Sequence, residues 1–369
     1  MRIVYILTSL GMGGAERQTL ALASRMQERG HTLALLVLRP KLADEWPTSL
    51  PTVHLDMRRT ARSLLLSLLH GQRFLRKFHP DLVHSHSFHA NLVARLLRVS
   101  VPSPRLLCTI HNVYEGGWHR MLLYRVTDPL ATCTTAVSAA AMRSFVCKGA
   151  VPNQKCVVVC NGIGVEELVP SAERRARVRM EMSVGEAFIW LAAGRIVPAK
   201  DLSNLLRAFA LLRGSRTDAR LWIAGATVGA EFERVRALAL RLGLSDSVCW
   251  LGLRRDLPAL LDAADGFVLA SAWEGMPLVI GEAMAMEKVV AATDVGGVRE
   301  LAGEAALLAT CRDPEALAEA MLKAMRMSAT ERWALGRAAR ARIVERFDVE
   351  ERMLEWDSLY SALLTQKPS

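Results

Sequence analysis

Short apolar runs alternate with longer amphipathic segments along the chain. The first run, 3–7, is rich in β-branched residues and leads through Gly11-Met12-Gly13-Gly14 into a helical pattern over about 15–30. A second apolar run at 32–38 completes a strand–helix–strand unit, which is typical of a parallel sheet. Further strands of this series are predicted at 82–84, 106–110 and 157–159.

The same rhythm restarts after a polar, charged stretch at 170–186, which we interpret as a partly helical link between domains. A helix is predicted at 202–212, and strands at 189–193, 221–224, 266–270 and 289–292. The tail from about residue 348 has apolar residues at helical spacing. The pattern predicts an α/β fold with two Rossmann-like parallel-sheet domains, over 1–168 and 169–347, and a last helix over 348–369.

Composition agrees with two folded domains. The chain has 369 residues, of which 51% are apolar and 23% charged, so disorder is not expected. No apolar window is long enough for a transmembrane helix, and the N-terminus lacks the features of a signal peptide, so a cytoplasmic location is expected. The seven cysteines form no C-x-x-C pair and are predicted to be buried free thiols.

The net charge of +10 is unevenly distributed. Residues 1–165 contain 20 Lys+Arg and 8 Asp+Glu, a balance of +12, whereas the remainder contains 27 and 29, a balance of −2. Anionic lipid head groups or a phosphorylated acceptor are candidate partners for the basic half. Nucleic acid is not expected, because no recognition motif is present. The alternative is an arginine-rich composition without an anionic partner.

Two loops that follow predicted strands suit a phosphorylated ligand, because ligands of open parallel sheets bind beyond the carboxyl ends of the strands. Gly11-Met12-Gly13-Gly14 can bring backbone N–H groups close to a phosphate, or can form a plain tight turn. It is not the G-x-G-x-x-G fingerprint of dinucleotide sites. Arg195 and Lys200 lie on a second loop and can reach one diphosphate, unless that loop is simply solvated.

The third loop, 271–283, is the most specific. Glu274 directly follows a predicted strand, and Pro277 suits a first helical turn. Glu282 lies eight positions beyond Glu274, roughly 80° further round a helix, so both carboxylates can border one cavity. Each can accept hydrogen bonds from a ribose or hexose diol. The alternative, a solvated Glu282, is disfavoured by its apolar neighbours.

These residues resemble a known family. The spacing Glu274…Glu282 is similar to the E-x7-E motif of retaining glycosyltransferases with the two-domain GT-B fold. Further motifs, in the expected order, resemble glycosyltransferase family 4: Gly13-Gly14-Ala15-Glu16, Asn161-Gly162-Ile163, Gly194-Arg195…Lys200, Trp250-Leu251-Gly252, and Thr293-Asp294-Val295-Gly296-Gly297 followed by Glu300. The resemblance implies that the two domains face each other across a cleft and that the helix over 348–369 crosses back to the N-terminal domain.

The resemblance also implies roles for individual residues. Arg195 and Lys200 would hold the diphosphate of the donor, Glu282 its ribose, and Glu274 the transferred sugar. His111 matches a histidine that many members place near that sugar. The other residues implied to bind the substrate are Gly13, Gly14 and Asn161, together with the backbone amides of Gly275, Met276 and Leu278.

The implied activity is retaining transfer of a hexose or related sugar from a UDP- or GDP-linked donor to a glycan or lipid-linked acceptor, in cell-surface polysaccharide or glycolipid synthesis. No cofactor and no metal are expected, since no D-x-D motif is present, and cationic side chains and helix dipoles would neutralise the leaving group. Three positions depart from the family pattern and are expected to affect only local packing or interdomain geometry: Gly164, Glu287 and Val289.

Two features have more than one interpretation. His84, His86 and His89 follow a predicted strand and are interpreted as lining an acceptor cleft, with ordinary loop histidines or a metal site as alternatives. The segment 58–79 has the pattern of a basic amphipathic helix. It can lie on an anionic membrane, which would place the protein peripherally on the inner membrane face, or it can be a domain helix with a solvated basic face.

Rival functions are a sugar-nucleotide epimerase of similar shape and a non-catalytic nucleotide-sugar-binding subunit. A nicotinamide dehydrogenase is disfavoured by the incomplete glycine fingerprint. The sequence does not determine the sugar, the base, the acceptor, the linkage or the oligomeric state.

Overall fold

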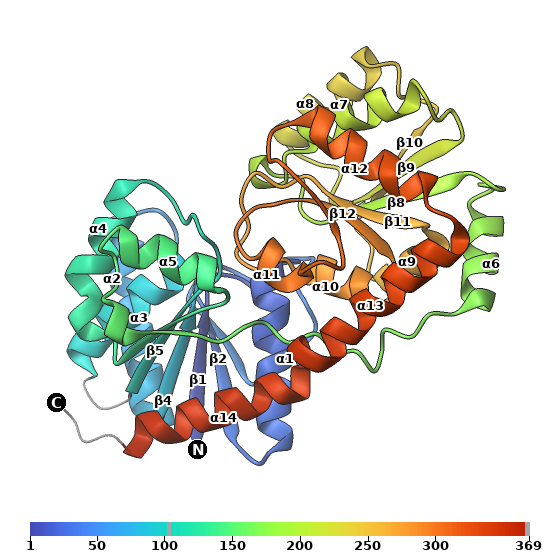
Figure 1. Ribbon diagram of the computed structural model, residues 1–369. Helices are drawn as coiled ribbons and strands as arrows, with labels where there is room; N and C mark the ends of the chain where they lie inside the picture. Colours follow the sequence, from blue (N-terminus) through green and yellow to red (C-terminus); the bar gives the residue numbers. More distant parts are fainter. Residues whose placement is uncertain (102–104, 366–369) are drawn as a thin grey trace. The chain divides into compact units, whose positions relative to one another are not determined.

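The computed structural model describes residues 1–101 and 105–365. The chain forms two compact units, one comprising Met1–Gly162 together with the chain from Glu350 on, and the other Ile163–Val349. Each unit is built on its own parallel sheet with helices packed on it (Figure 1). The predicted α/β class with two parallel-sheet domains is confirmed. The first unit ends at Gly162, whereas the sequence pattern placed that boundary after residue 168.

The N-terminal sheet has seven parallel strands in the order β3-β2-β1-β4-β5-β6-β7. An interior strand, β1, is buried from Ile3 to Leu7 because helices cover both faces. The strands are β1 (Arg2–Leu7), β2 (Thr32–Val37), β3 (Thr52–His54), β4 (Leu82–His86), β5 (Arg105–Ile110), β6 (Cys133–Ala136) and β7 (Cys156–Val158). The α-helices are α1 (Gly14–Glu28), α2 (Ala61–Phe78), α3 (Phe88–Ser100), α4 (Trp118–Thr127) and α5 (Ala139–Cys147).

The last helix, α14 (Val349–Thr365), belongs to this N-terminal unit. Its Met353, Trp356, Tyr360 and Leu363 are buried in the same apolar cluster as Tyr5 and other residues of the sheet. Arg25, in the last turn of α1, pairs with Glu350, and Arg29, just beyond α1, pairs with both Glu350 and Asp357. The apolar residues that recur at helical spacing in the tail therefore cover one face of the N-terminal sheet.

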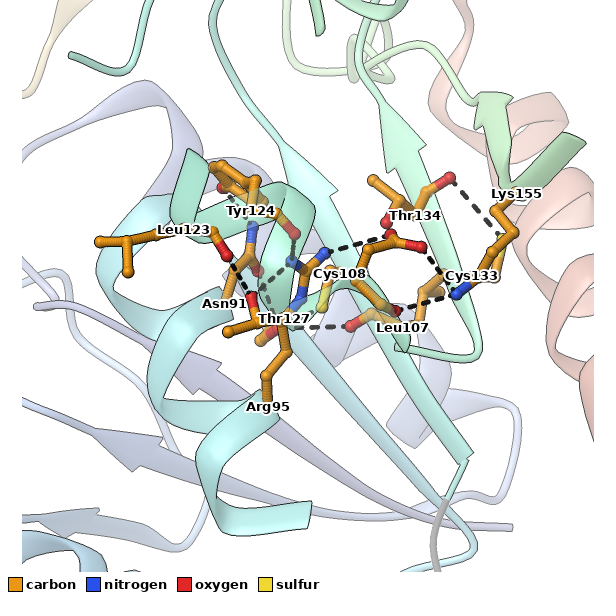
Figure 2. A network of polar contacts seen from close by, with 12 residues as sticks. Asn91, Arg95, Leu107, Cys108, Leu123, Tyr124, Thr127, Cys133, Thr134 and Lys155 are labelled. Carbon is orange, nitrogen blue, oxygen red and sulfur yellow. Dashed lines mark hydrogen bonds and ion pairs between the residues drawn. The ribbon is translucent and has the colours of Figure 1, made fainter. Parts of the chain in front are cut away.

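A buried arginine connects the helices on the other side of the sheet (Figure 2). Arg95 of α3 donates to the carbonyl oxygen of Tyr124 at 2.9 Å and to the hydroxyl of Thr127 at 3.1 Å. Asn91, one turn earlier, donates to the hydroxyl of Tyr124 at 3.0 Å. These bonds fix α4 against α3, and therefore fix the loop that leads from β5 into α4.

The C-terminal sheet has six parallel strands in the order β10-β9-β8-β11-β12-β13. The strands are β8 (Phe188–Ala193), β9 (Ala219–Ala224), β10 (Val248–Gly252), β11 (Gly266–Leu269), β12 (Val289–Thr293) and β13 (Leu307–Ala309). The α-helices are α6 (Ala172–Glu181), α7 (Leu202–Arg213), α8 (Ala230–Arg241), α9 (Leu257–Ala263), α10 (Leu278–Ala285), α11 (Val298–Ala302), α12 (Pro314–Arg326) and α13 (Ala329–Phe347).

The charged stretch at 170–186 forms α6 and is part of the C-terminal unit. Asp262, almost fully buried, pairs with Arg174 and accepts a hydrogen bond from the backbone of Ser171. Arg175 and Arg179 both pair with Asp265. The arginines of this stretch therefore attach α6 to the end of α9 and to Asp265 just after it, and the stretch is a packed helix more than a link.

All seven cysteines are free, as predicted, but their burial varies. Cys108, Cys133 and Cys156 are buried, whereas Cys147 is exposed at the end of α5. The prediction that every thiol is buried is therefore wrong for Cys147. None of the helices in the described part of the chain combines the length and apolar character needed to cross a bilayer.

Candidate functional site

The carboxyl edge of the C-terminal sheet is shaped by two glycines. Gly194 follows β8 with a φ of +143°, which favours glycine. Gly225 follows β9, and a Cβ there would collide with the carbonyl oxygen of Gly194. Because neither residue has a side chain, the loops after β8 and β9 approach each other closely. The β8 loop then continues into Arg195.

A hollow that is open to solvent lies at this edge and is lined by both predicted diphosphate-binding cations. Arg195 is exposed, and Lys200 ends the 3₁₀ turn η3 (Pro198–Lys200). Asp201 then adopts a left-handed conformation and caps α7 through the amide of Asn204. The hollow is lined by Ala192, Ala193, Gly194, Arg195, Lys200, Leu202, Leu205, Ile223, Val268, Leu269 and Ala270.

The structure brings Lys200 and Glu274 into direct contact, although 74 positions separate them. The Lys200 Nζ atom lies 2.6 Å from Glu274 Oε1, and Ser271 Oγ donates to the same oxygen at 2.7 Å. Glu274 is only 8% exposed, so the ammonium and the hydroxyl offset much of the desolvation cost of its carboxylate. Sequence reasoning missed Ser271, whose signal is its position three residues before Glu274 at the end of β11.

The loop after Glu274 is held by the neighbouring strand and helix. Thr293 Oγ1 donates to the carbonyl oxygen of Ser271 at 2.7 Å, and the amide of Gly297 donates to the carbonyl oxygen of Gly275 at 2.8 Å. Met276 is buried, and Leu278 is the first residue of α10. The loop that carries three of the predicted backbone contacts is therefore a fixed turn.

Glu282 lies within α10 and is 3% exposed, so the solvated alternative is excluded. It is not among the residues that line the hollow at Arg195 and Lys200. The structure thus unites Arg195, Lys200 and Glu274 at one edge, and places Glu282 on the helix that begins just beyond it.

In the N-terminal unit, Gly13 is the N-cap of α1 and Gly14 is its first residue. A Cβ at position 13 would collide with the carboxylate of Glu16, which lies over the first turn of the helix. The amide of Gly13 donates to the carbonyl oxygen of Gly11 at 2.7 Å. A side chain at position 13 would displace the Glu16 carboxylate, whereas the extended backbone there is open to any residue. Asn161 lies beyond β7 and is buried.

His111 follows β5 and contacts another histidine. Its Nε2 atom lies 3.0 Å from Nδ1 of His86, the last residue of β4, so the two rings share one hydrogen-bonding proton. Burial lowers the pKa of His111 to about 4 and, together with the neighbouring His84 and His111, lowers that of His86. Both imidazoles are therefore neutral at physiological pH.

The three histidines of the 84–89 segment differ in their surroundings. His84 is a core residue, with Nδ1 2.7 Å from the Tyr360 hydroxyl of α14 and Nε2 2.6 Å from the Thr109 hydroxyl. His86 is 3% exposed, and only His89, at the start of α3, is exposed. The expectation that all three line a cleft is therefore wrong for His84, which fixes the last helix to the sheet.

Sequence reasoning also missed Glu115, next to His111. Its carboxylate accepts a hydrogen bond from the Tyr124 hydroxyl at 2.8 Å and from the backbone amide of His111 at 3.4 Å. Desolvation raises the pKa of Glu115 to about 7. No group of three or more His, Cys, Asp or Glu side chains with the geometry of a metal site occurs among residues 1–101 and 105–365.

Each unit matches a family model. Residues 12–167 match the model described as Glycosyltransferase Family 4, and residues 179–342 match the model described as Glycosyl transferases group 1. Together the two matched segments cover most of the chain.

Curated relatives and solved structures agree with these matches. A D-inositol 3-phosphate glycosyltransferase of Corynebacterium urealyticum is 31% identical over 65% of this chain, which spans 62% of that relative's length. An N-acetylgalactosamine-N,N'-diacetylbacillosaminyl-diphospho-undecaprenol 4-alpha-N-acetylgalactosaminyltransferase of Campylobacter jejuni is 25% identical, over 82% of this chain and 84% of its own. The structure of Anabaena HepE in complex with UDP and glucose has a TM-score of 0.86 at 22% identity, and covers 98% of this chain and 100% of its own.

Proposed function

The chain belongs to glycosyltransferase family 4, and on that premise we propose that it transfers a hexose or related sugar from a UDP- or GDP-linked donor to a glycan or lipid-linked acceptor. The name of the Campylobacter relative, which specifies a diphospho-undecaprenol acceptor, supports the lipid-linked class. The Anabaena structure, a complex with UDP and glucose, supports a nucleotide-sugar donor. The product would enter cell-surface polysaccharide or glycolipid synthesis.

The single observation that carries this proposal is the 2.6 Å contact between Lys200 and Glu274, next to the exposed guanidinium of Arg195. An ammonium group has three donors, so Lys200 can bind a phosphate oxygen while it still holds Glu274. Arg195 supplies a planar fork to the same diphosphate. Glu274, held at fixed position, accepts hydroxyl hydrogen bonds from the transferred sugar.

The other predicted residues complete this assignment. Glu282 is proposed to bind the ribose, and the amides of Gly275, Met276 and Leu278 to bind sugar hydroxyls or phosphate. In the N-terminal unit we assign contacts with the diphosphate to Gly13 and Gly14, and contacts with the sugar to Asn161 and His111. Because His111 is neutral, it offers the sugar a hydrogen bond without adding a positive charge.

We propose that the anomeric configuration is retained by front-face attack. The acceptor oxygen forms a bond to the anomeric carbon as the bond to the donor phosphate breaks, and the departing phosphate takes the acceptor's proton. Arg195 and Lys200 stabilise the charge that develops on the phosphate, without a requirement for a metal ion. Removal of one such donor typically lowers the rate by about 10²–10³-fold.

We further propose that the protein is cytoplasmic and that its N-terminal unit contacts the anionic inner face of the membrane. The balance of +12 within residues 1–165 and the exposed leucines of α2 support this contact. Flotation with anionic liposomes should show binding at low salt that decreases at high salt. If the protein does not float with the liposomes at low salt, the proposed membrane contact is contradicted.

A donor screen that follows release of free UDP or GDP tests the transfer. The wild-type protein should release one nucleotide in an acceptor-dependent reaction, and the anomeric proton signals of donor and product should have the same configuration. Arg195→Ala and Lys200→Ala should each reduce turnover about 10²–10³-fold. Conversion of the donor sugar without acceptor would favour an epimerase, and donor binding without any turnover would favour a non-catalytic subunit.

A further inference from the structure

A basic cluster lies at the carboxyl edge of the N-terminal sheet, apart from the residues assigned above. It consists of Arg39, Arg59, Arg120 and His89, and these residues come from four different segments. Arg39 follows β2, Arg59 precedes α2, His89 lies in the first turn of α3, and Arg120 lies in the first turn of α4. These segments follow β2, β3, β4 and β5, so the parallel sheet brings their starts to one edge.

Packing and electrostatics show that these cations converge. The Arg120 guanidinium lies 4.6 Å above the ring of Phe88, and the His89 ring lies 5.2 Å from the same ring. Partial burial lowers the pKa of His89, and the positive charges of Arg120, Arg39 and Arg59 lower it further. All three guanidinium groups therefore lie near one imidazole and disfavour its protonation.

No ion pair joins these arginines to an acidic side chain in the described part of the chain, although the charge of Arg120 acts on the nearby Glu115 carboxyl. Arg120 donates to a backbone carbonyl oxygen, that of Glu115, at 2.5 Å. Three arginines that repel one another at one edge form an arrangement that binds a multivalent anion well, because each guanidinium can contact phosphate oxygens through paired N–H groups.

Apolar surface flanks the cluster on two helices. On α2, which begins just after Arg59, the side chains of Leu65, Leu66 and Leu69 are 60%, 46% and 40% exposed. On α4, exposed Trp118, Leu122 and Val126 recur every four residues and so form one stripe. Both helices pack on α3, which carries His89 (Figure 1). A ligand that combines phosphate with hydrocarbon would match both parts of this surface.

We propose that Arg39, Arg59 and Arg120, gathered round His89, bind the diphosphate of a lipid-linked acceptor, and that the exposed leucines of α2 and the stripe of α4 contact its hydrocarbon chain. This inference rests on the proposed function, which requires an acceptor but does not locate it. It assigns three of the positive charges of the N-terminal unit to a defined site and a defined class of acceptor.

The His89 ring is a local reporter for this site. A bound diphosphate brings negative charge next to the imidazole, so the pKa of His89 rises on binding. The test is a titration of the full-length protein with farnesyl diphosphate in saturating UDP, which occupies the proposed donor site. The His89 ring signal, assigned by its loss in His89→Gln, is followed by NMR. The expected result is a saturable upward shift of the His89 titration curve.

Matched variants decide whether the arginines are the cause. Arg39→Ala and Arg59→Ala, both at exposed positions, should each weaken farnesyl diphosphate binding about tenfold or more. Arg143→Ala removes an equal charge from an exposed position on α5 and should leave binding unchanged. Equal binding in all three variants would overturn the proposal, as would a His89 signal that does not respond to the ligand.

Two further probes distinguish the sources of phosphate. Inorganic pyrophosphate should bind at least about tenfold more weakly than farnesyl diphosphate, because it lacks the chain. Equal affinities would overturn the lipid-linked assignment. Phosphatidylglycerol vesicles that shift the His89 signal when farnesyl diphosphate does not would indicate a membrane-surface contact instead. If farnesyl diphosphate does not bind at the His89 site but the donor screen shows sugar transfer, only the acceptor-site inference is contradicted. If farnesyl diphosphate binds but no sugar transfer occurs, the proposed function is contradicted.

Discussion

Single residues of the C-terminal unit gain their chemistry from neighbours that are distant in sequence. Arg195, Lys200, Glu274 and Glu282 could all be selected from the sequence, because glycine loops and the E-x7-E spacing are local patterns. The contact between Lys200 and Glu274 could not be predicted, since it joins loops after two different strands. Ser271 was not selected, because its position three residues before Glu274 is a weak signal and a serine at a strand end has many other roles.

Glu287 shows how backbone conformation explains a departure from the family pattern. It stands where glycine is frequent in the family, and its φ is +57°, in the left-handed region that costs an ordinary residue about 1 kcal/mol. We therefore expect Glu287→Gly to raise the free energy of unfolding of the C-terminal unit by about 1 kcal/mol relative to Glu287→Ala. The alanine variant retains the strain but, like the glycine variant, lacks the carboxylate next to Lys288.

Urea unfolding of both variants measures this difference. Equal midpoints for the glycine and alanine variants would show that the left-handed conformation at 287 carries no strain.

At the scale of elements, most strands were predicted, including the polar β4 and the short β7, whereas β3, β6, β10 and β13 were not. β1, β2, β4, β5, β7, β8, β9, β11 and β12 lie within a few residues of their predicted positions. β3 and β13 are three-residue edge strands, and β6 has the sequence Cys-Thr-Thr-Ala, so none has a strong hydrophobic pattern. Their pairing partners, which the sequence does not identify, stabilise them.

The last helix gives a test at this scale. Trp356 of α14 is 5% exposed, and its ring lies 5.0 Å from that of His84. Trp356→Ala should destabilise the N-terminal unit by about 3–5 kcal/mol, because it leaves a cavity against the sheet. Leu354→Ala, at a 56% exposed position of the same helix, should change stability by less than about 0.5 kcal/mol.

Thermal unfolding of the two variants distinguishes these expectations. A Trp356→Ala protein as stable as Leu354→Ala would mean that α14 does not contribute to the core of the N-terminal unit.

At the scale of the whole molecule, the buried titratable groups of the N-terminal unit predict acid sensitivity. Burial lowers the pKa values of His84, His86 and His111, so below about pH 6.5 the unfolded chain holds more protons at these sites than the folded chain. Glu115, with a pKa of about 7, acts in the opposite direction between about pH 4.5 and 7. The three histidines favour the unfolded chain as the pH falls, and only Glu115 favours the folded one. We therefore expect the free energy of unfolding to decrease by about 1–3 kcal/mol per pH unit between pH 6.5 and 5.

Hydrogen exchange of the β1 and β4 amides, corrected for intrinsic rates, measures this dependence for the N-terminal unit alone. His84→Gln should reduce the slope by about 1 kcal/mol per pH unit. A stability that is constant or rises between pH 6.5 and 5 would show that the three imidazoles are not held neutral in the folded state.

The division into two sheets and the family could be predicted for the whole molecule, because successive strand–helix series and ordered motifs are visible in one dimension. The end of the first unit at Gly162 could not, since compactness depends on packing and not on the position of the charged stretch. The central claim is that the edge containing Arg195, Lys200 and Glu274 binds a nucleotide diphosphate.

Calorimetric titration of UDP and GDP into the wild-type protein, Lys200→Ala and Lys323→Ala tests this claim most directly. Lys323 is an exposed lysine of α12 in the same unit and controls for the loss of charge. The account predicts that one nucleotide binds the wild type and Lys323→Ala equally, and Lys200→Ala at least about tenfold more weakly. Binding of neither nucleotide, or equal binding by all three proteins, would contradict it.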